Sequence, residues 1–292
     1  MKLTTYWWRP FGTPRAAAAS ALHSGRAWLA LATARGGGMR NFGDDLNRLV
    51  VPELTGHRAV WSPIEAAELV VIGSVLDTAA TKGFSGRVLG AGVRDPETLA
   101  DGLTVRAKVL GVRGVDSARA LGVSSRLAIG DPGLIVSAMF TRTRGERRPA
   151  VLPHFGVVNT AEGRRALSGL RARGYKVILP SIDPAEVAAE ISSSSFLLTS
   201  SLHGLIFAHS YGVPVQLVDF QVGGYREPMF KYRDYLSIFE ARIDVLPLDE
   251  AMRSGPARVA ELMESAECAG SEIDRRLHSV MSGIYAAASA LI

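Results

Sequence analysis

The chain of 292 residues is 47% hydrophobic and 21% charged, a composition typical of a globular protein with one large or two medium domains. Its single cysteine, Cys268, excludes an internal disulfide and a multi-cysteine zinc site. The formal net charge of +5 fits anionic small substrates or a membrane surface as well as nucleic acid. No zinc-finger, RNA-recognition or K-homology motif is present, so we expect no nucleic-acid partner.

The apolar segments of the chain are not typical of targeting or membrane-spanning segments. The stretch 27–34 is short and is bounded by Arg26 and Arg35, and no segment reaches the roughly 18 apolar residues that a spanning helix requires. We therefore expect a cytoplasmic protein. The alanine-rich stretch 16–34 fits a helix, an insertion or a contact with the membrane surface, which leaves peripheral association with the inner face of the cell membrane open.

From residue 68 onward, short apolar runs alternate with amphipathic segments of helical length, which is typical of a parallel sheet flanked by helices. In the first half of the chain this pattern predicts strands at residues 69–72, 88–89, 107–110 and 127–129. Turns of glycine and small residues follow three of them. Because ligands of open parallel sheets bind beyond the carboxyl ends of the strands, we expect a site at these turns.

A polar, arginine-rich stretch at 141–149 interrupts the pattern and predicts a domain boundary. Beyond it, the sequence predicts strands at residues 150–152, 176–179, 196–199 and 215–218, helices at 161–173, 184–192 and 202–211, and a helical tail at 249–292 that can pack back across the boundary. We therefore predict an α/β fold with two Rossmann-like domains facing a cleft, as in B-type glycosyltransferases. The domains would be residues 1–145 and 146–292. Fold alone names no reaction.

The first candidate motif contains Asn41, Gly43, Asp44 and Asp45, directly before apolar residues at helical spacing. A carboxylate at the start of a helix accepts backbone N–H bonds and is stabilised by the helix dipole. Taken alone, such an aspartate is a capping residue more often than a catalytic one, and the glycine serves a turn. Both interpretations of Asp44 and Asp45 stay open at this point.

The second candidate motif, Ser200, Ser201, Leu202, His203 and Gly204, lies where a predicted strand runs into a predicted helix. Backbone N–H groups in the first turn of a helix have no partner within the helix and can hold a phosphate. Serine hydroxyls and an imidazole beside them predict an oxyanion-binding site. The alternative is a helix capped by Ser200 or Ser201, with His203 merely exposed.

Together, the two motifs resemble the polysaccharide pyruvyl transferase family. Its members carry an Asn-x-Gly-Asp-[Asp/Glu] segment, as at 41–45, and later an [Arg/Ser]-x-His-Gly element followed by Gly-Val-Pro, as at 201–204 and 212–214. The similarity extends over roughly residues 41–236. The Tyr-Trp-Trp-Arg start at 6–9 also resembles the branch that decorates bacterial exopolysaccharides.

The resemblance implies transfer of pyruvate from phosphoenolpyruvate to a sugar of an exopolysaccharide or cell-wall glycan precursor, forming a cyclic pyruvate ketal and releasing phosphate. It implies that Arg113, Ser201, Leu202 and His203 hold the donor. The acceptor would be a lipid-linked or nucleotide-linked glycan. The other residues expected to contact substrate are Ser200, Gly204, Asn41, Gly43 and Lys231.

Some members carry arginine where Ser201 stands, which leaves less positive charge for the donor in this chain. Whether Arg40, Arg94 or Lys231 compensates stays open.

Ketal formation requires a proton on the enol carbon. We expect His203 to donate it, or to stabilise the leaving phosphate, once the donor is bound, because a helix N-terminus favours the neutral imidazole until then. Asp44 or Asp45 is expected to serve as the base for the attacking hydroxyl. No cofactor is expected, since the donor carries the activated group, and no dense cluster of histidine and carboxylate ligands predicts a metal.

Two other functions fit the same pattern. A sugar-nucleotide glycosyltransferase would share the two-domain architecture and a helix N-terminus for a diphosphate. A non-catalytic glycan-assembly protein descended from the enzyme is the second alternative. The sequence does not identify the acceptor sugar, the stereochemistry of the ketal or the oligomeric state.

Overall fold

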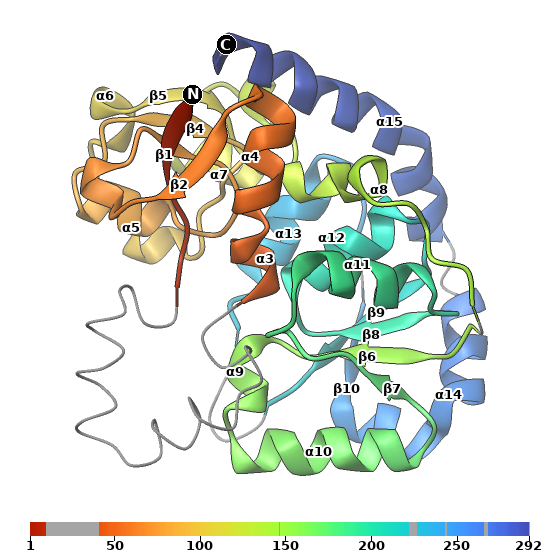
Figure 1. Cartoon of the computed structure of the whole chain (residues 1–292). Coiled ribbons are helices and arrows are strands. Elements are labelled where there is room, and N and C mark those ends of the chain that lie inside the picture. The colour runs from red at the N-terminus through yellow and green to blue at the C-terminus, as the bar shows by residue number, and fades with distance from the viewer. Residues whose placement is uncertain (10–40, 146, 222–226, 243, 266–267, 292) are drawn as a thin grey trace.

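The computed structural model of the chain describes residues 1–9, 41–145, 147–221, 227–242, 244–265 and 268–291. It is an α/β structure with two five-stranded sheets, and the strand pairs within both sheets are parallel. Figure 1 shows helices packed around each sheet. The predicted α/β class with parallel sheets is therefore confirmed. The alanine-rich stretch 16–34 and Arg40 lie outside the described residues.

The first sheet has the strand order β2-β1-β3-β4-β5. Its strands are β1 (Lys2–Tyr6), β2 (Arg58–Trp61), β3 (Leu69–Val70), β4 (Arg87–Leu89) and β5 (Lys108–Gly111). The α-helices of this part are α3 (Phe42–Asp45), α4 (Asn47–Thr55), α5 (Leu76–Thr81), α6 (Leu103–Arg106), α7 (Val115–Ala120) and α8 (Val136–Met139). Short 3₁₀ helices are η1 (Ile64–Ala66), η2 (Pro96–Thr98), η3 (Ser125–Leu127) and η4 (Pro132–Ile135).

The second sheet has the strand order β10-β9-β8-β6-β7. Its strands are β6 (Ala150–Leu152), β7 (Lys176–Val177), β8 (Leu197–Thr199), β9 (Val215–Asp219) and β10 (Val245–Pro247). The helices are α9 (Phe155–Val158), α10 (Ala161–Ala172), α11 (Pro184–Ser192), α12 (Leu202–Ser210), α13 (Phe230–Ser237), α14 (Leu248–Ser265), α15 (Cys268–Ala288) and the 3₁₀ turn η5 (Ser289–Leu291).

Both sheets follow the same topology. When the strands of each sheet are counted from its own first strand, both orders become 2-1-3-4-5, which is one of the two common doubly wound arrangements. The direction of winding reverses between β1 and β3 in the first sheet and between β6 and β8 in the second. Ligands of doubly wound sheets bind outside the carboxyl ends of the strands at such a reversal. Segments that follow β3, β6 and β8 are therefore where a site is expected.

Most predicted strands and helices are present. The strands predicted at 69–72, 88–89, 107–110, 150–152, 176–179, 196–199 and 215–218 overlap β3 to β9, and the helices predicted at 161–173, 184–192 and 202–211 overlap α10 to α12. The prediction of a strand at 127–129 is wrong. Leu127 is the last residue of the 3₁₀ helix η3, and a single parallel bridge joins Ala128 to Val112. Strands β1, β2 and β10 were not predicted.

The hydrophobic interior is continuous between the sheets. Alternate residues of each strand face opposite sides of its sheet. One large hydrophobic cluster contains Leu69 from the first sheet and Leu152 and Leu197 from the second. Their neighbours Val70 and Leu198 lie in two smaller clusters, one against each sheet. Because the main cluster crosses residue 145, the division of the chain into domains 1–145 and 146–292 stays a prediction.

Helix α15 packs back onto the first half of the chain. It contacts α4, β5 and η4 as well as α12 of the second half, and Figure 1 shows it running along both. Its side chains Ile284 and Ala288 are buried in the main cluster. The C-terminal helix therefore ties the two sheets together.

Candidate active site

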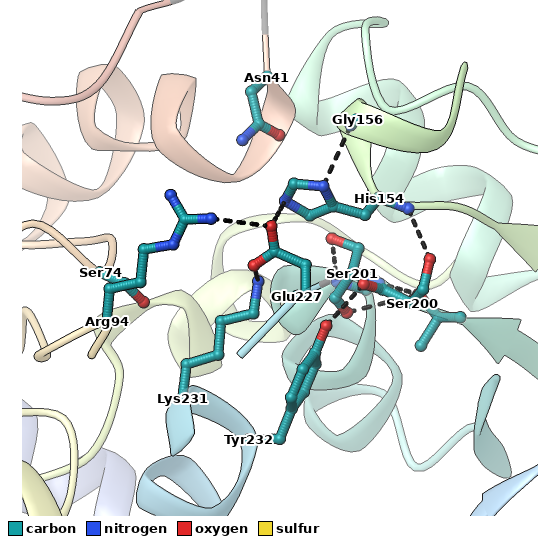
Figure 2. Close-up of polar contacts among 12 residues, drawn as sticks. Asn41, Ser74, Arg94, His154, Gly156, Ser200, Ser201, Glu227, Lys231 and Tyr232 are labelled. Atoms are coloured by element: carbon teal, nitrogen blue, oxygen red, sulfur yellow. Dashed lines mark hydrogen bonds and ion pairs between the residues drawn. The ribbon is translucent and has the colours of Figure 1, made fainter. Parts of the chain in front are cut away.

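The candidate site lies at the carboxyl ends of strands from both sheets. His154 follows β6, Ser200 and Ser201 follow β8, and Ser74 and Arg94 follow β3 and β4 of the first sheet. Figure 2 shows these side chains around a common centre, with Glu227 between Arg94 and His154. This is the position that the reversal of winding in the second sheet predicts.

Hydroxyl groups fix the junction between β8 and α12. Ser201 is the N-cap of α12, and its hydroxyl accepts a 3.3 Å hydrogen bond from the N–H of Gly204. The Thr199 hydroxyl accepts from the N–H of Ser201 at 2.9 Å and donates to the carbonyl of Leu152 at 2.7 Å, which joins β8 to β6. The Ser200 hydroxyl accepts from the N–H of His154 at 2.8 Å. The serines therefore position the first turn of α12 and the loop that carries His154.

Two residues of the second motif serve the packing of this junction. Leu202 is buried in the main cluster. Gly204 lies so close to Thr199 that a Cβ on the glycine would meet the threonine hydroxyl at 2.5 Å. Both residues were predicted to contact substrate, and that remains a prediction.

His203 is buried in the first turn of α12, so the alternative of an exposed histidine is wrong. Its ring meets Phe42 edge to face at 6.2 Å between centroids and packs against Gly43. Burial, with the positive charges of Lys231 and Arg113 acting in the same direction, lowers the pKa of His203 to about 3. The Nε2 atom is buried with no hydrogen-bond partner among the described residues. An interior imidazole with an unused nitrogen is a group that a ligand can satisfy.

Asp44 lies in α3, next to the segment that follows β3. Asn41 donates a 2.6 Å hydrogen bond from its Nδ2 to the carboxylate, and a Cβ on Gly73 would come within 2.8 Å of Asp44 Oδ1. Burial raises the pKa of Asp44 to about 7, against the opposing effects of the Asn41 hydrogen bond and the charge of Lys231. A carboxyl group that titrates near neutrality can give or take a proton under ordinary conditions.

Asp45 points into a different network. Its carboxylate pairs with Nε of Arg48 at 2.9 Å, and Arg48 also pairs with Asp183, the N-cap of α11. This network joins α3 and α4 to the second half of the chain. The structure therefore brings Asp44, and not Asp45, toward the charged groups that surround His203.

The positive charge of Lys231 acts on several titratable groups of the site. It is 5% exposed at the start of α13, and its charge lowers the pKa of Asp44, His154 and His203. Burial lowers the pKa of Lys231 itself, while the carboxylate of Glu227 opposes that effect. The ammonium group pairs with Glu227 Oε2 and lies 5.0 Å from the ring centre of Tyr232.

Glu227 is a site residue that the sequence motifs did not indicate. Its Oε1 lies 3.2 Å from Nη2 of Arg94 and 3.6 Å from Nε2 of His154. The His154 Nδ1 accepts a hydrogen bond from the N–H of Gly156 at 3.1 Å, so the neutral imidazole carries its proton on Nε2, toward Glu227. Burial, with the charge of Lys231, lowers the pKa of His154 to about 3. Arg94, which the sequence analysis named as a possible compensating charge, follows a glycine turn at the end of β4.

Residues 88–219 match the family model described as polysaccharide pyruvyl transferase. The match covers β4 to β9 and includes Arg94, Arg113, His154 and the segment 200–204. Over these residues, the chain is similar to the polysaccharide pyruvyl transferase family.

Two relatives are similar to parts of the chain. An uncharacterised protein, L143, of Acanthamoeba polyphaga mimivirus is 31% identical over 120 residues, which cover 39% of this chain and 41% of that protein. The succinoglycan biosynthesis protein ExoV of Rhizobium meliloti (strain 1021) is 30% identical over 184 residues, which cover 60% of this chain and 54% of that protein. The matched parts thus span about half the length of these relatives or less.

Arg113, which lies within the matched residues, is fully buried, and its guanidinium is held by protein groups. Nε pairs with Asp234 Oδ2 at 2.8 Å, Nη1 donates to the Ser74 hydroxyl at 2.6 Å, and Nη2 donates to the Val93 carbonyl at 2.7 Å. The Asp234 carboxylate also accepts from the N–H and the hydroxyl of Ser117, at 2.6 and 2.7 Å. Arg113 therefore reaches the site through Ser74, and direct binding of the donor by its guanidinium stays a prediction.

Other structural features lie apart from this site. A cavity of about 560 Å³ is lined by residues that include Arg148 before β6, Lys176 at the start of β7 and Ser194 before β8, and it thus lies at the amino ends of these strands. Within the described ranges, no group of three or more His, Cys, Asp or Glu side chains is arranged to hold a metal ion. A search of the same residues finds no helix with the length and apolar character needed to span a membrane.

Proposed function

We propose that this protein transfers pyruvate from phosphoenolpyruvate to two hydroxyl groups of one sugar in an exopolysaccharide or cell-wall glycan precursor. The product is a cyclic pyruvate ketal, and phosphate is released. The observation that carries the proposal is a buried histidine within the family match, His203, whose Nε2 has no hydrogen-bond partner among the described residues. The charge of Lys231 acts on this histidine and lowers its pKa. The name of the succinoglycan biosynthesis relative supports a polysaccharide acceptor.

The reaction balances without a redox step. A proton adds to the methylene carbon of phosphoenolpyruvate, and the first sugar hydroxyl forms a bond to the carbon that carries the phosphate. The carbon–oxygen bond to phosphate then breaks, and the second hydroxyl forms the second ketal bond to the same carbon. Of the two hydroxyl protons, one replaces the proton used on the methylene group and the other leaves with phosphate. No cofactor is required in this scheme, because the donor itself carries the activated group.

In the proposed mechanism His203 interacts with the donor through Nε2. Its pKa of about 3 means that the imidazole is neutral in the free protein. A phosphate dianion close to the ring favours the protonated form and raises this pKa. His203 then donates the proton to the donor or stabilises the leaving phosphate, and the first turn of α12 holds the phosphate with its backbone N–H groups.

Asp44 serves as the base for the attacking hydroxyl. Its pKa of about 7 is close to the ideal for a base at neutral pH, where it is partly ionised and still basic enough to accept a proton. We assign the role to Asp44 and not to Asp45, because Arg48 engages the carboxylate of Asp45. Residues 1–145 would then contribute the acceptor side and residues 146–292 the donor side, in two Rossmann-like domains facing a cleft. A lipid-linked acceptor would require the protein to work at the membrane surface.

The proposal is tested by incubating the protein with phosphoenolpyruvate and lipid-linked glycans and measuring phosphate release and glycan mass. The expected result is stoichiometric phosphate release with one pyruvate ketal per modified sugar. Consumption of a nucleotide sugar in place of phosphoenolpyruvate would instead identify a glycosyltransferase. Glycan binding with turnover of neither donor would identify a non-catalytic assembly protein.

A His203→Ala variant tests the assignment of the proton donor. Removal of a general acid typically lowers the rate by about 100-fold or more, so we expect turnover to be abolished while the circular dichroism spectrum stays that of the folded protein. Near-normal turnover in a folded His203→Ala protein would remove His203 from the mechanism.

A further inference from the structure

One carboxylate is shared by three nitrogen groups in the candidate site. Glu227 Oε2 pairs with Nζ of Lys231, while Oε1 lies 3.2 Å from Nη2 of Arg94 and 3.6 Å from Nε2 of His154. Figure 2 shows the carboxylate of Glu227 between these groups. Arg94 comes from the first sheet, His154 from the second, and Lys231 from α13. The cluster therefore joins the carboxyl ends of both sheets.

Among the described residues that pair with Glu227, the charges do not balance. Arg94 and Lys231 supply two positive charges, His154 is neutral because its pKa is lowered to about 3, and Glu227 supplies one negative charge. Lys231 is 5% exposed, and a buried ammonium is costly unless it is paired. A group with one excess positive charge next to Asp44 and His203 attracts an anion.

The pair Arg113–Asp234 shows a different arrangement in the same protein. There, one cation meets one carboxylate, both side chains are fully buried, and Ser74, Val93 and Ser117 provide further hydrogen bonds. This is what a structural ion pair needs to offset its desolvation. The pair of Arg94 with Glu227 is different. About half of the Arg94 side chain is exposed, and Arg94 reaches the Glu227 carboxylate from the end of β4 in the first sheet.

We propose that Arg94 and Lys231 form a binding site for the carboxylate or phosphate of the donor, and that the carboxylate of Glu227 occupies this site until the donor displaces it. A carboxylate is the same chemical group that phosphoenolpyruvate presents, and it makes the same charge-assisted hydrogen bonds. The identity of the donor rests on the proposed function, whereas the exchange of Glu227 for an anion does not. Donor binding then transfers Lys231 and Arg94 from an internal anion to an external one.

The test measures anion binding without turnover. Inorganic phosphate and pyruvate are titrated separately by calorimetry into the wild type, Glu227→Gln and Glu190→Gln. Glutamine keeps the shape of the side chain and removes the competing charge, and repulsion between like charges at a site costs enough that we expect at least about tenfold tighter binding of one of the two anions. Glu190→Gln is the matched control, because it also removes a glutamate from a lysine pair, that of Lys176 in the second half of the chain.

Two further variants complete the design. Adding Arg94→Gln to Glu227→Gln should return the affinity to the wild-type value or weaker, which identifies Arg94 as part of the anion site. If Glu227→Gln does not fold, Glu227→Asp keeps the charge but shortens its reach and should bind the anion more tightly than the wild type. Unchanged affinity for both anions in the folded variants would overturn the inference.

The two proposals fail in different ways. If the protein does not use phosphoenolpyruvate, the glycan assay gives no phosphate release while the anion titrations still distinguish Glu227→Gln from the wild type. If the inference is wrong and the proposed function is right, turnover is seen and the titrations do not differ. With both correct, Glu227→Gln should also lower the KM for phosphoenolpyruvate and leave the KM for the glycan unchanged.

Discussion

Gly43 leaves room for the imidazole of His203 because it has no side chain. A Cβ on Gly43 would lie 1.9 Å from Nδ1 and 2.3 Å from Cγ of the ring, far inside any normal contact. Phe42 packs against the same ring, so the imidazole would have to move. The glycine of the first motif therefore has a reason beyond its turn: it lets α3 approach α12.

Replacing Gly43 with alanine is expected to lower kcat by about 100-fold, because displacing a catalytic group by about 1 Å has that order of effect. The matched control is Gly283→Ala, since a Cβ at Gly283 would meet nothing within 4 Å. Steady-state kinetics of the two folded variants compare them. Equal kcat values would show that the position of the His203 ring is not critical.

Asp44 links activity and stability to pH through its raised pKa. A base must be deprotonated, so kcat/KM of the wild type should rise with pH and level off above the pKa of about 7. In Asp44→Asn this limb of the profile should disappear, with the rate lower by at least about 100-fold. A pH–rate profile of both proteins measures it, and an unchanged limb in the variant would assign the ionisation to another group.

The same carboxyl group should lower stability at high pH. Its folded pKa of about 7 lies above the ordinary value of 3.8, so the folded protein holds this proton more tightly than the unfolded chain does. That contribution is fully present below 3.8 and is lost as the pH rises through 7. The unfolding free energy of Asp44→Asn relative to the wild type should therefore increase from about pH 4 to pH 7 and stay constant above. Urea unfolding across this range measures it, and a difference that falls with pH would contradict the prediction.

At the scale of elements, the ion pair between Arg113 and Asp234 attaches α13, and with it Lys231, to the first sheet. Asp234 lies on α13, and its backbone comes so close to Gly114 that a Cβ there would meet the Asp234 carbonyl oxygen at 1.8 Å. Helix α13 and α7 are in contact beside this point. The pair therefore fixes the position of Lys231, whose charge acts on Asp44 and His203.

Asp234→Asn should destabilise the protein by about 3 kcal/mol, because it leaves the buried charge of Arg113 without its partner. The control is Asp116→Asn, which removes the exposed pair with Arg119 and should change stability by less than about 1 kcal/mol. Urea unfolding at pH 7 compares the two. Similar small losses in both would show that the buried pair has no special structural importance.

Local sequence patterns predicted the strands whose faces are both buried and did less well at the sheet edges. Strands β6 and β8 are short apolar runs with buried residues throughout, and they were predicted to within one residue. Of the four edge strands, β5 and β7 were predicted, whereas β2 and β10, which are very short and have only exposed or half-buried residues, were not. The segment 127–129 has the apolar character of a strand, but tertiary packing gives it a 3₁₀ turn and one bridge.

For the whole molecule, the sequence predicted the positions of candidate residues best where a motif and a strand end coincide. His203 and Ser201 lie on both, and they are positioned as expected at the first turn of a helix. Glu227 lies on neither, and its role depends on partners from residues 94, 154 and 231, which only the folded chain brings together. The choice between Asp44 and Asp45 likewise follows from long-range contacts, because Arg48 links Asp45 to Asp183.

The shared interior of the two halves predicts a single unfolding transition. Helix α15 begins beyond the second sheet and packs on the first, where a Cβ on Gly130 would come within 2.6 Å of Val280 and 3.6 Å of Ile284. Among the described tryptophans, Trp61 donates a 2.9 Å hydrogen bond to the Trp7 carbonyl within the first half of the chain, and Trp8 meets Phe155 of α9. Tryptophan fluorescence therefore reports mainly on the first half, while far-ultraviolet circular dichroism reports on the helices of both.

Ile284→Ala removes a fully buried side chain from this contact and should cost about 2–5 kcal/mol. Because the same cluster continues into the second sheet, we expect the fluorescence and circular dichroism transitions to move together to lower urea concentration. If the two halves were independent domains, the fluorescence transition alone would shift, and the two curves would separate.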